Sequence, residues 1–104
     1  MRAILFVVAC VTCSSSAFAQ ELPKFDVEAH CKKVASFGGS YSATIDESCF
    51  YLEQGAYNKL KQSWPDVSTR SRKHCTQVAG FGGSGSYTIL ESCIDMEASA
   101  ASKN

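Results

Sequence analysis

One segment of this chain occurs twice, and the duplication limits the possible folds more than any other feature of the sequence. A shift of 44 residues aligns positions 30–56 with positions 74–100 without a gap, and 16 of the 27 aligned pairs are identical. Each copy holds two cysteines 18 positions apart, with a Phe-Gly-Gly-Ser segment between them. Such internal similarity indicates a supersecondary unit that is used twice. The two copies are therefore expected to share one local structure.

The first 19 residues have the layout of a secretory signal peptide. Arg2 gives a positive start, residues 3–11 form an apolar run, and residues 17–19 read Ala-Phe-Ala, a typical cleavage site. The apolar run is about half as long as the ~20 residues of a membrane-spanning helix. We therefore expect a signal peptide at 1–19, a single small domain at 20–104 without a transmembrane segment, and export to the periplasm or the extracellular space. A lipoprotein anchored through Cys10 is the alternative, although the apolar segment before that cysteine is short for this route.

Cleavage would remove two of the six cysteines and leave Cys31, Cys49, Cys75 and Cys93. An even number of cysteines in a short exported chain predicts disulfides rather than reactive thiols. Helical hairpin geometry favours pairing Cys31 with Cys49 and Cys75 with Cys93, since the two sulfurs of each pair then lie at similar depth. The two other connectivities, which would cross-link the copies, remain open at this stage.

Apolar residues recur at helical spacing in both arms of each copy, which predicts an all-α fold. The expected structure is two tandem disulfide-linked helical hairpins, four helices in all, in repeats at about 26–64 and 66–100. The apolar positions expected to face the core are Val27, Cys31 and Val34, then Ile45, Cys49, Leu52, Ala56, Leu60 and Trp64, and in the second copy Cys75, Val78, Ala79, Ile89, Cys93, Met96 and Ala100.

The ends of the predicted helices are marked by capping residues and glycines. Asp26 is a candidate N-cap for the first helix, and Asp66 or Ser68 for the third. Thr-x-x-Glu segments at 44–47 and 88–91 fit capping boxes, although Ser40 or Ser42 could start the second helix earlier. Gly-Gly pairs close the first arm of each copy. We expect the two phenylalanines before these pairs, at 37 and 81, to pack within the hairpins, and the tail from 98 onward to fray.

The sequence favours no catalytic, cofactor or metal site. Zinc ligands usually come in close Cys-x-x-Cys pairs, whereas His30-Cys31 and His74-Cys75 are adjacent and point about 100° apart on a helix. The segment 80–85 fits a G-x-G-x-x-G pattern, but it follows a predicted helix instead of a strand. Ten basic and ten acidic residues argue against nucleic acid as a partner. The basic residues between 59 and 73 are expected to form the solvated face of a helix.

The repeated unit, H-C-x-x-V-A-x-F-G-G-S-x-S-x-T-I-x-E-S-C, resembles one found in small exported proteins of Gram-negative bacteria with no assigned activity. The resemblance covers about 26–100 and implies compartment and architecture only. The expected function is a non-catalytic binding or interaction module with an envelope or secreted protein as its partner. The alternatives are a small-ligand or metal-binding protein that uses the His-Cys positions, and an inhibitor of a secreted hydrolase.

Overall fold

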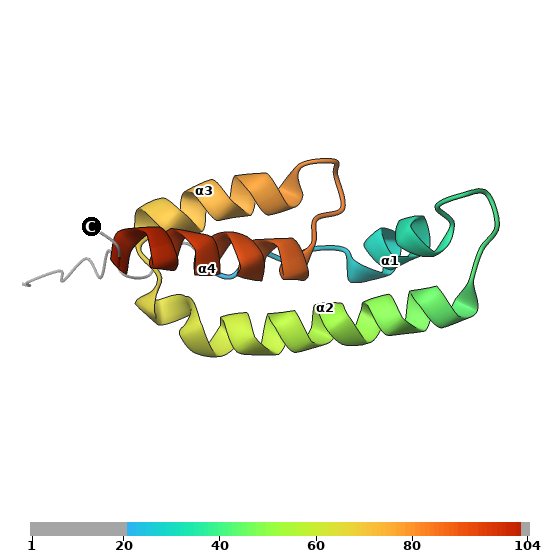
Figure 1. Ribbon diagram of the computed structural model, residues 1–104, viewed down its shortest axis with the longest axis horizontal. Coiled ribbons are helices and arrows are strands. Elements are labelled where there is room, and N and C mark those ends of the chain that lie inside the picture. Colours follow the sequence, from blue (N-terminus) through green and yellow to red (C-terminus); the bar gives the residue numbers. More distant parts are fainter. Residues whose placement is uncertain (1–20, 103–104) are drawn as a thin grey trace, which may run out of the picture.

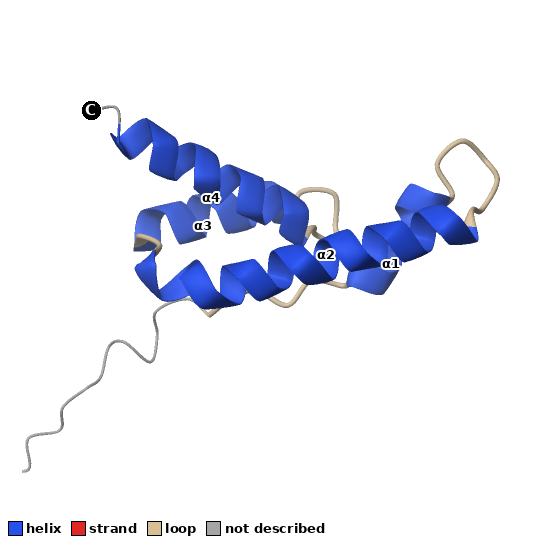
Figure 2. Ribbon diagram, turned by 60° about the horizontal axis from the view of Figure 1, so that its bottom comes forward, coloured by secondary structure: helices blue, strands red, loops and turns tan. Residues whose placement is uncertain are grey.

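The computed structural model describes residues 21–102, which form helices and loops without a strand (Figure 1). The first hairpin is formed by α1 and the N-terminal half of α2, and the second hairpin by α3 and α4. The second hairpin lies along the C-terminal half of α2, as two views show (Figures 1 and 2). The elements are α1 (Val27–Ala35), α2 (Ala43–Ser63), the short 3-10 helix η2 (Trp64–Asp66), α3 (Thr69–Gly80) and α4 (Tyr87–Ser102). The predicted all-α fold is confirmed, whereas the expected signal peptide and the Cys10 alternative lie outside the described residues.

Each hairpin is closed by its own disulfide, as the favoured pairing predicted. Cys31 is bonded to Cys49 and Cys75 to Cys93, with 5.5 Å between the Cα atoms of each pair. The first bond joins α1 to α2, and the second joins α3 to α4. The two copies of the repeat are therefore held to each other by non-covalent contacts and by the continuous chain.

The long helix of each hairpin begins after a serine, two residues before the predicted capping box. Ser42 Oγ accepts a hydrogen bond from the backbone N–H of Ile45 at 3.3 Å, and Ser86 Oγ accepts the equivalent bond from Ile89 at 3.3 Å. The Ser42 and Ser86 N–H groups in turn donate to carbonyls at the ends of α1 and α3. These hydrogen bonds make the two serines the N-caps of α2 and α4, so Thr44 and Thr88 are not the caps.

The N-caps of α1 and α3 are residues that the sequence predicted, whereas the C-terminal end of α4 differs from the prediction. Asp26 Oδ1 accepts from the Ala29 N–H at 3.0 Å, and Ser68 Oγ accepts from the Ser71 N–H at 3.2 Å. The predicted fraying from position 98 is wrong within the described residues, because α4 stays helical through Ser102.

The core lies between the second hairpin and the C-terminal half of α2. Its buried members are Ala56, Leu60, Trp64, Cys75, Ala79, Tyr87, Leu90 and Ile94. The prediction for α4 is therefore wrong, because the face with Ile89 and Met96 is exposed and the face with Leu90 and Ile94 is buried. The reason is that α4 packs against two partners, α3 and α2, whereas the prediction considered its hairpin partner alone.

A short segment before α1 ties the two hairpins together. The Tyr87 hydroxyl donates to the Pro23 carbonyl at 2.7 Å and accepts from the Phe25 N–H at 2.9 Å. The Phe25 and Tyr87 rings lie 4.9 Å apart, and the Asp26 N–H donates to the Ser84 carbonyl at 3.1 Å. Burial raises the pKa of the Tyr87 phenol. The start of α1 is thus fastened to the turn of the second hairpin.

The contact between Phe25 and Gly85 yields a stability prediction. Gly85 has a φ of +82°, and a Cβ placed on it would lie 2.2 Å from a Phe25 ring carbon. We expect Gly85→Ala to destabilise the protein by about 1–3 kcal/mol for the backbone conformation, with a further cost for overpacking against the ring. Urea unfolding followed by circular dichroism measures the change.

Gly39→Ala is the matched control, because Gly39 has a φ of +101° but open space around its Cβ position. It isolates the cost of the backbone conformation. Equal losses in the two variants would show that the Phe25 ring moves aside without cost, which contradicts the proposed packing.

Candidate binding surfaces on the two hairpins

Each hairpin carries a groove on its surface between its two helices. The groove of the first hairpin has a volume of about 330 Å³ and that of the second about 490 Å³. Seven positions of the repeat line both grooves, and six of these hold the same residue in both copies. The lining residues are His30, Val34, Ile45, Ser48, Cys49, Leu52 and Glu53 in the first groove, and His74, Val78, Ile89, Ser92, Cys93, Met96 and Glu97 in the second.

The apolar side chains of the grooves are exposed to matching degrees in the two copies. All six belong to the helical stripes that the sequence assigned to the core, and they form three pairs of repeat-related positions. The exposed fractions are 40% and 43% for Val34 and Val78, 48% and 46% for Ile45 and Ile89, and 67% and 71% for Leu52 and Met96. Their assignment to the core is wrong, because no element of residues 21–102 covers these faces.

The turn of each hairpin presents a phenylalanine to solvent. Phe37 and Phe81 are each 92% exposed, so their predicted packing inside the hairpins is wrong. The helix ends just before each ring, and the following glycines all have positive φ and turn the chain back toward the second arm. Phe37 also borders a hollow with His30, Val34 and Ile45, which extends the first groove toward the turn. Among the tyrosines, 57 and 87 pack in the interior, whereas 41 and 51 are exposed.

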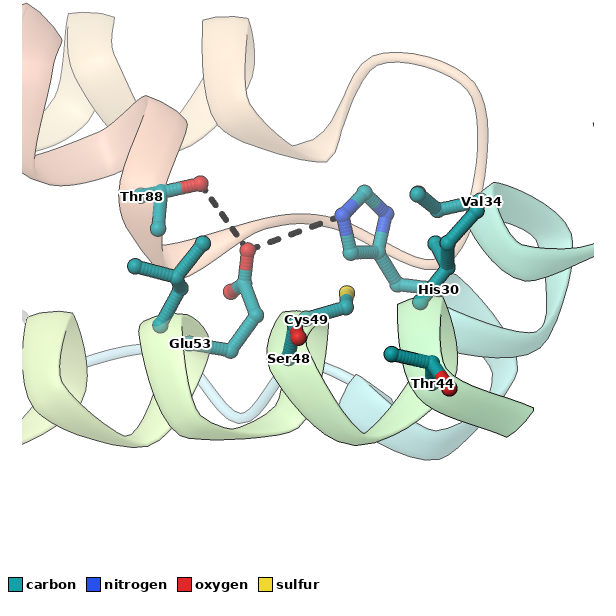
Figure 3. Close-up of a pocket in the computed structure, with 9 residues that line it drawn as sticks. His30, Val34, Thr44, Ser48, Cys49, Glu53 and Thr88 are labelled. Carbon is teal, nitrogen blue, oxygen red and sulfur yellow. Dashed lines mark hydrogen bonds and ion pairs between the residues drawn. The ribbon is translucent and has the colours of Figure 1, made fainter. Parts of the chain in front are cut away.

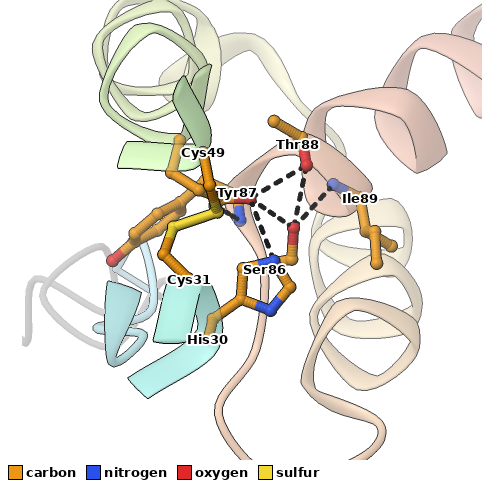
Figure 4. A network of polar contacts seen from close by, with 8 residues as sticks. His30, Cys31, Cys49, Ser86, Tyr87, Thr88 and Ile89 are labelled. Atoms are coloured by element: carbon orange, nitrogen blue, oxygen red, sulfur yellow. Dashed lines mark hydrogen bonds and ion pairs between the residues drawn. A yellow bond between two sulfur atoms is a disulfide. The ribbon is translucent and has the colours of Figure 1, made fainter. Parts of the chain in front are cut away.

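A buried glutamate closes the inner end of the first groove (Figure 3). Glu53 is 2% exposed, and its carboxylate accepts hydrogen bonds from the Ser86 hydroxyl at 2.6 Å, the Tyr87 N–H at 2.5 Å and the Thr88 hydroxyl at 2.9 Å. His30 Nε2 lies 3.5 Å from the same carboxylate. Figure 4 shows His30 beside Ser86, Tyr87 and Thr88 at the first turn of α4.

Glu53 lies at the N-terminus of α4. The N-terminus of a helix carries unpaired N–H groups and a partial positive charge, which a carboxylate stabilises. A glutamate of the first hairpin thus caps a helix of the second. Sequence reasoning missed this role, although Glu53 and Glu97 are one of the identical pairs of the repeat.

The equivalent His–Glu pair of the second hairpin, His74 and Glu97, is exposed to solvent. His74 Nε2 is 3.6 Å from Glu97 Oε1, and the two side chains are 57% and 40% exposed. Within residues 21–102 no helix N-terminus reaches Glu97. The repeat therefore places one His–Glu pair in two different environments.

Comparison with known proteins gives no relative. The chain matches no protein-family model, no curated protein and no solved structure.

The structure also shows where the other candidate positions of the sequence analysis lie. All four cysteines of residues 21–102 are oxidised, so the His-Cys pairs supply no thiolate ligands, and no three His, Cys, Asp or Glu side chains of that range are placed to hold a metal ion. In the glycine segment at 80–85, Gly80 ends α3 and the other residues lie in the turn between α3 and α4. Arg72 is buried and donates to the Trp64 and Pro65 carbonyls, so it does not belong to the expected solvated basic face. None of the described helices is both long and apolar enough to span a bilayer.

Proposed function

We propose that this protein is an exported, non-catalytic binding module whose two hairpins present the same apolar surface to a partner protein. The observation that carries the proposal is the pairwise match of exposed apolar residues, such as Val34 with Val78 and Ile45 with Ile89. Large exposed apolar patches on small proteins mark interaction sites. The two disulfides fit an oxidising compartment outside the cytoplasm, where an envelope or secreted protein would be the partner.

The polar groups of the grooves support binding over catalysis. The Glu53 carboxylate accepts from three donors at the start of α4, so it serves the packing of the hairpins. A nucleophile next to a base, held by a third group, is the usual arrangement for covalent catalysis. Each groove instead offers one His–Glu pair beside apolar side chains and an oxidised cysteine.

The proposal is tested by photo-crosslinking in the native host. A crosslinking amino acid replaces Ile45 in one variant and Ile89 in another, with the exposed repeat-related positions Gln54 and Ala98 as controls. We expect both groove positions to capture the same partner protein and the controls to capture none. Equal capture at the control positions, or no capture at either groove, would contradict the proposed function.

A further inference from the structure

We infer that each groove binds an amphipathic α-helix of the partner protein, so that one chain holds two such helices. This inference rests on the proposed function and specifies the chemistry of the occupant. Four observations lead to it: the course of one apolar track along α2, the length of the open part, its repetition on α4, and the absence of a matching face on the first hairpin of a second copy, as far as residues 21–102 show.

The apolar track of α2 is continuous, but only half of it is covered. Ile45, Ser48, Leu52, Ala56, Leu60 and Trp64 follow one another by three or four residues and so lie along one side of the helix. Ala56, Leu60 and Trp64 are 5%, 2% and 6% exposed, because the second hairpin packs on them. Ile45 and Leu52 on the same track are 48% and 67% exposed. The covered half shows what this surface accommodates, namely a helix.

The open half has an apolar lining and the length of a short helix. Val34 of α1 forms the second wall of the groove, and Thr88 of α4 forms its inner end. Ile45 and Leu52 are seven residues apart, which corresponds to about 10 Å along α2. Two to three turns of an incoming helix cover this length, with apolar anchors at i, i+3 or i+4, and i+7. Phe37 extends the apolar surface beyond the groove.

The same arrangement recurs on the second hairpin. Ile89, Ser92 and Met96 of α4 repeat the spacing of Ile45, Ser48 and Leu52 of α2. Val78 of α3 again forms the opposite wall. Two sites of like geometry on one rigid scaffold predict two bound helices per chain, and a partner with two linked helices would gain from the high effective concentration of the second.

Within residues 21–102, a second copy of this chain does not offer on its first hairpin the face by which α4 packs on α2. Inside the molecule, α4 packs on α2 through Tyr87, Leu90 and Ile94. The equivalent positions of the first hairpin are Ala43, Asp46 and Phe50, and Asp46 accepts a hydrogen bond from the Tyr41 hydroxyl. A carboxylate in the centre of that face disfavours its burial on an apolar track. The fitting occupant is therefore a helix of another protein.

The test uses a synthetic peptide as the probe and the full mature chain as the receptor. The peptide is an amphipathic helix of Leu, Ala, Glu and Lys with leucines at i, i+3, i+4 and i+7, and its control has the same composition in an alternating order. Calorimetry gives the stoichiometry, and amide chemical shifts locate the sites. We expect two bound peptides per chain, shifts at Ile45 and Ile89, and at least about tenfold weaker binding of the control.

Two charge variants assign the sites separately. Leu52→Glu is expected to abolish binding and shift changes in the first groove alone, and Met96→Glu in the second alone. Both residues are more than two-thirds exposed, at 67% and 71%, so neither variant disturbs the core. Loss of both sites in either single variant would contradict independent sites.

The outcomes separate this inference from the proposed function. Equal binding of the alternating peptide, no binding at millimolar peptide, or a self-association that Leu52→Glu removes would each overturn helix binding. If the crosslinker at Ile45 and Ile89 still captures a partner in that event, the binding function stands and the occupant is not a helix. A failure of both experiments rejects the proposed function as well.

Discussion

Replacing Glu53 by alanine is expected to destabilise the protein by about 2–6 kcal/mol, because it leaves two buried hydrogen-bond donors unsatisfied at about 1–3 kcal/mol each. The variant leaves the buried Ser86 hydroxyl and Tyr87 N–H without this acceptor, and it also removes the acceptor of the partly buried Thr88 hydroxyl. The N-terminus of α4 also loses the carboxylate that opposes its partial positive charge. Urea unfolding with the disulfides intact measures the loss.

Glu97→Ala is the matched control, because Glu97 occupies the same position of the repeat and is 40% exposed. Its loss should cost less than about 1 kcal/mol, as for other exposed ion pairs. If the two variants lose similar amounts of unfolding free energy, the contribution of Glu53 does not come from capping α4, because Glu97 caps no described helix. Glu53→Gln, which keeps one acceptor oxygen, should fall between the wild type and Glu53→Ala.

Removal of the Cys75–Cys93 disulfide is expected to lower the stability of the whole molecule. The chain-entropy estimate for a loop of this length is about 3 kcal/mol. Cys75 is fully buried in the core that α3 and α4 share with α2, so the bond also organises the packing of that core. Replacing both cysteines by alanine should lower the midpoint of a single thermal transition.

Removal of the Cys31–Cys49 disulfide is expected to act locally. Among the described helices α1 packs on α2 alone, so the part of α1 beyond its fastened start can separate while the core around Leu60 and Leu90 stays intact. Hydrogen exchange should become faster for amides 27–35 in the variant with both cysteines replaced, while the core amides keep their protection. A uniform gain in exchange across α2, α3 and α4 would show instead that both bonds support one cooperative unit.

The duplication predicted the hairpins and their disulfides, but it could not predict which helix faces are buried. A repeat shows what two copies share, whereas the residues by which α4 packs on α2, Tyr87, Leu90 and Ile94, stand at positions where the copies differ. Leu90 and Ile94 are buried at positions that hold Asp46 and Phe50 in the first copy. Only the second hairpin packs against a helix outside itself, so only it needs apolar residues there.

The same reasoning explains what sequence analysis missed in the candidate site. Val34 and Ile45 are apolar at helical spacing, which is the pattern of core residues, and no local signal distinguishes a covered stripe from an open one. The second copy has Gly85 where the first copy has Tyr41. The Phe25 ring packs against this glycine, and Phe25 belongs to a segment outside the repeat. Both features follow from how the hairpins dock, and docking involves residues far apart in the sequence.

The disulfide pattern also affects the order of events when the chain matures. Every cysteine of the described domain is bonded to its nearest neighbour along the chain. A polypeptide that crosses a membrane from its N-terminus presents Cys31 and Cys49 to an oxidant before Cys75 and Cys93. Pairing cysteines in the order of their emergence then yields the native bonds directly, whereas shuffling of wrong pairs takes seconds to hours. Under the proposed export, the chain should need a thiol oxidase but no disulfide isomerase to reach its native bonds.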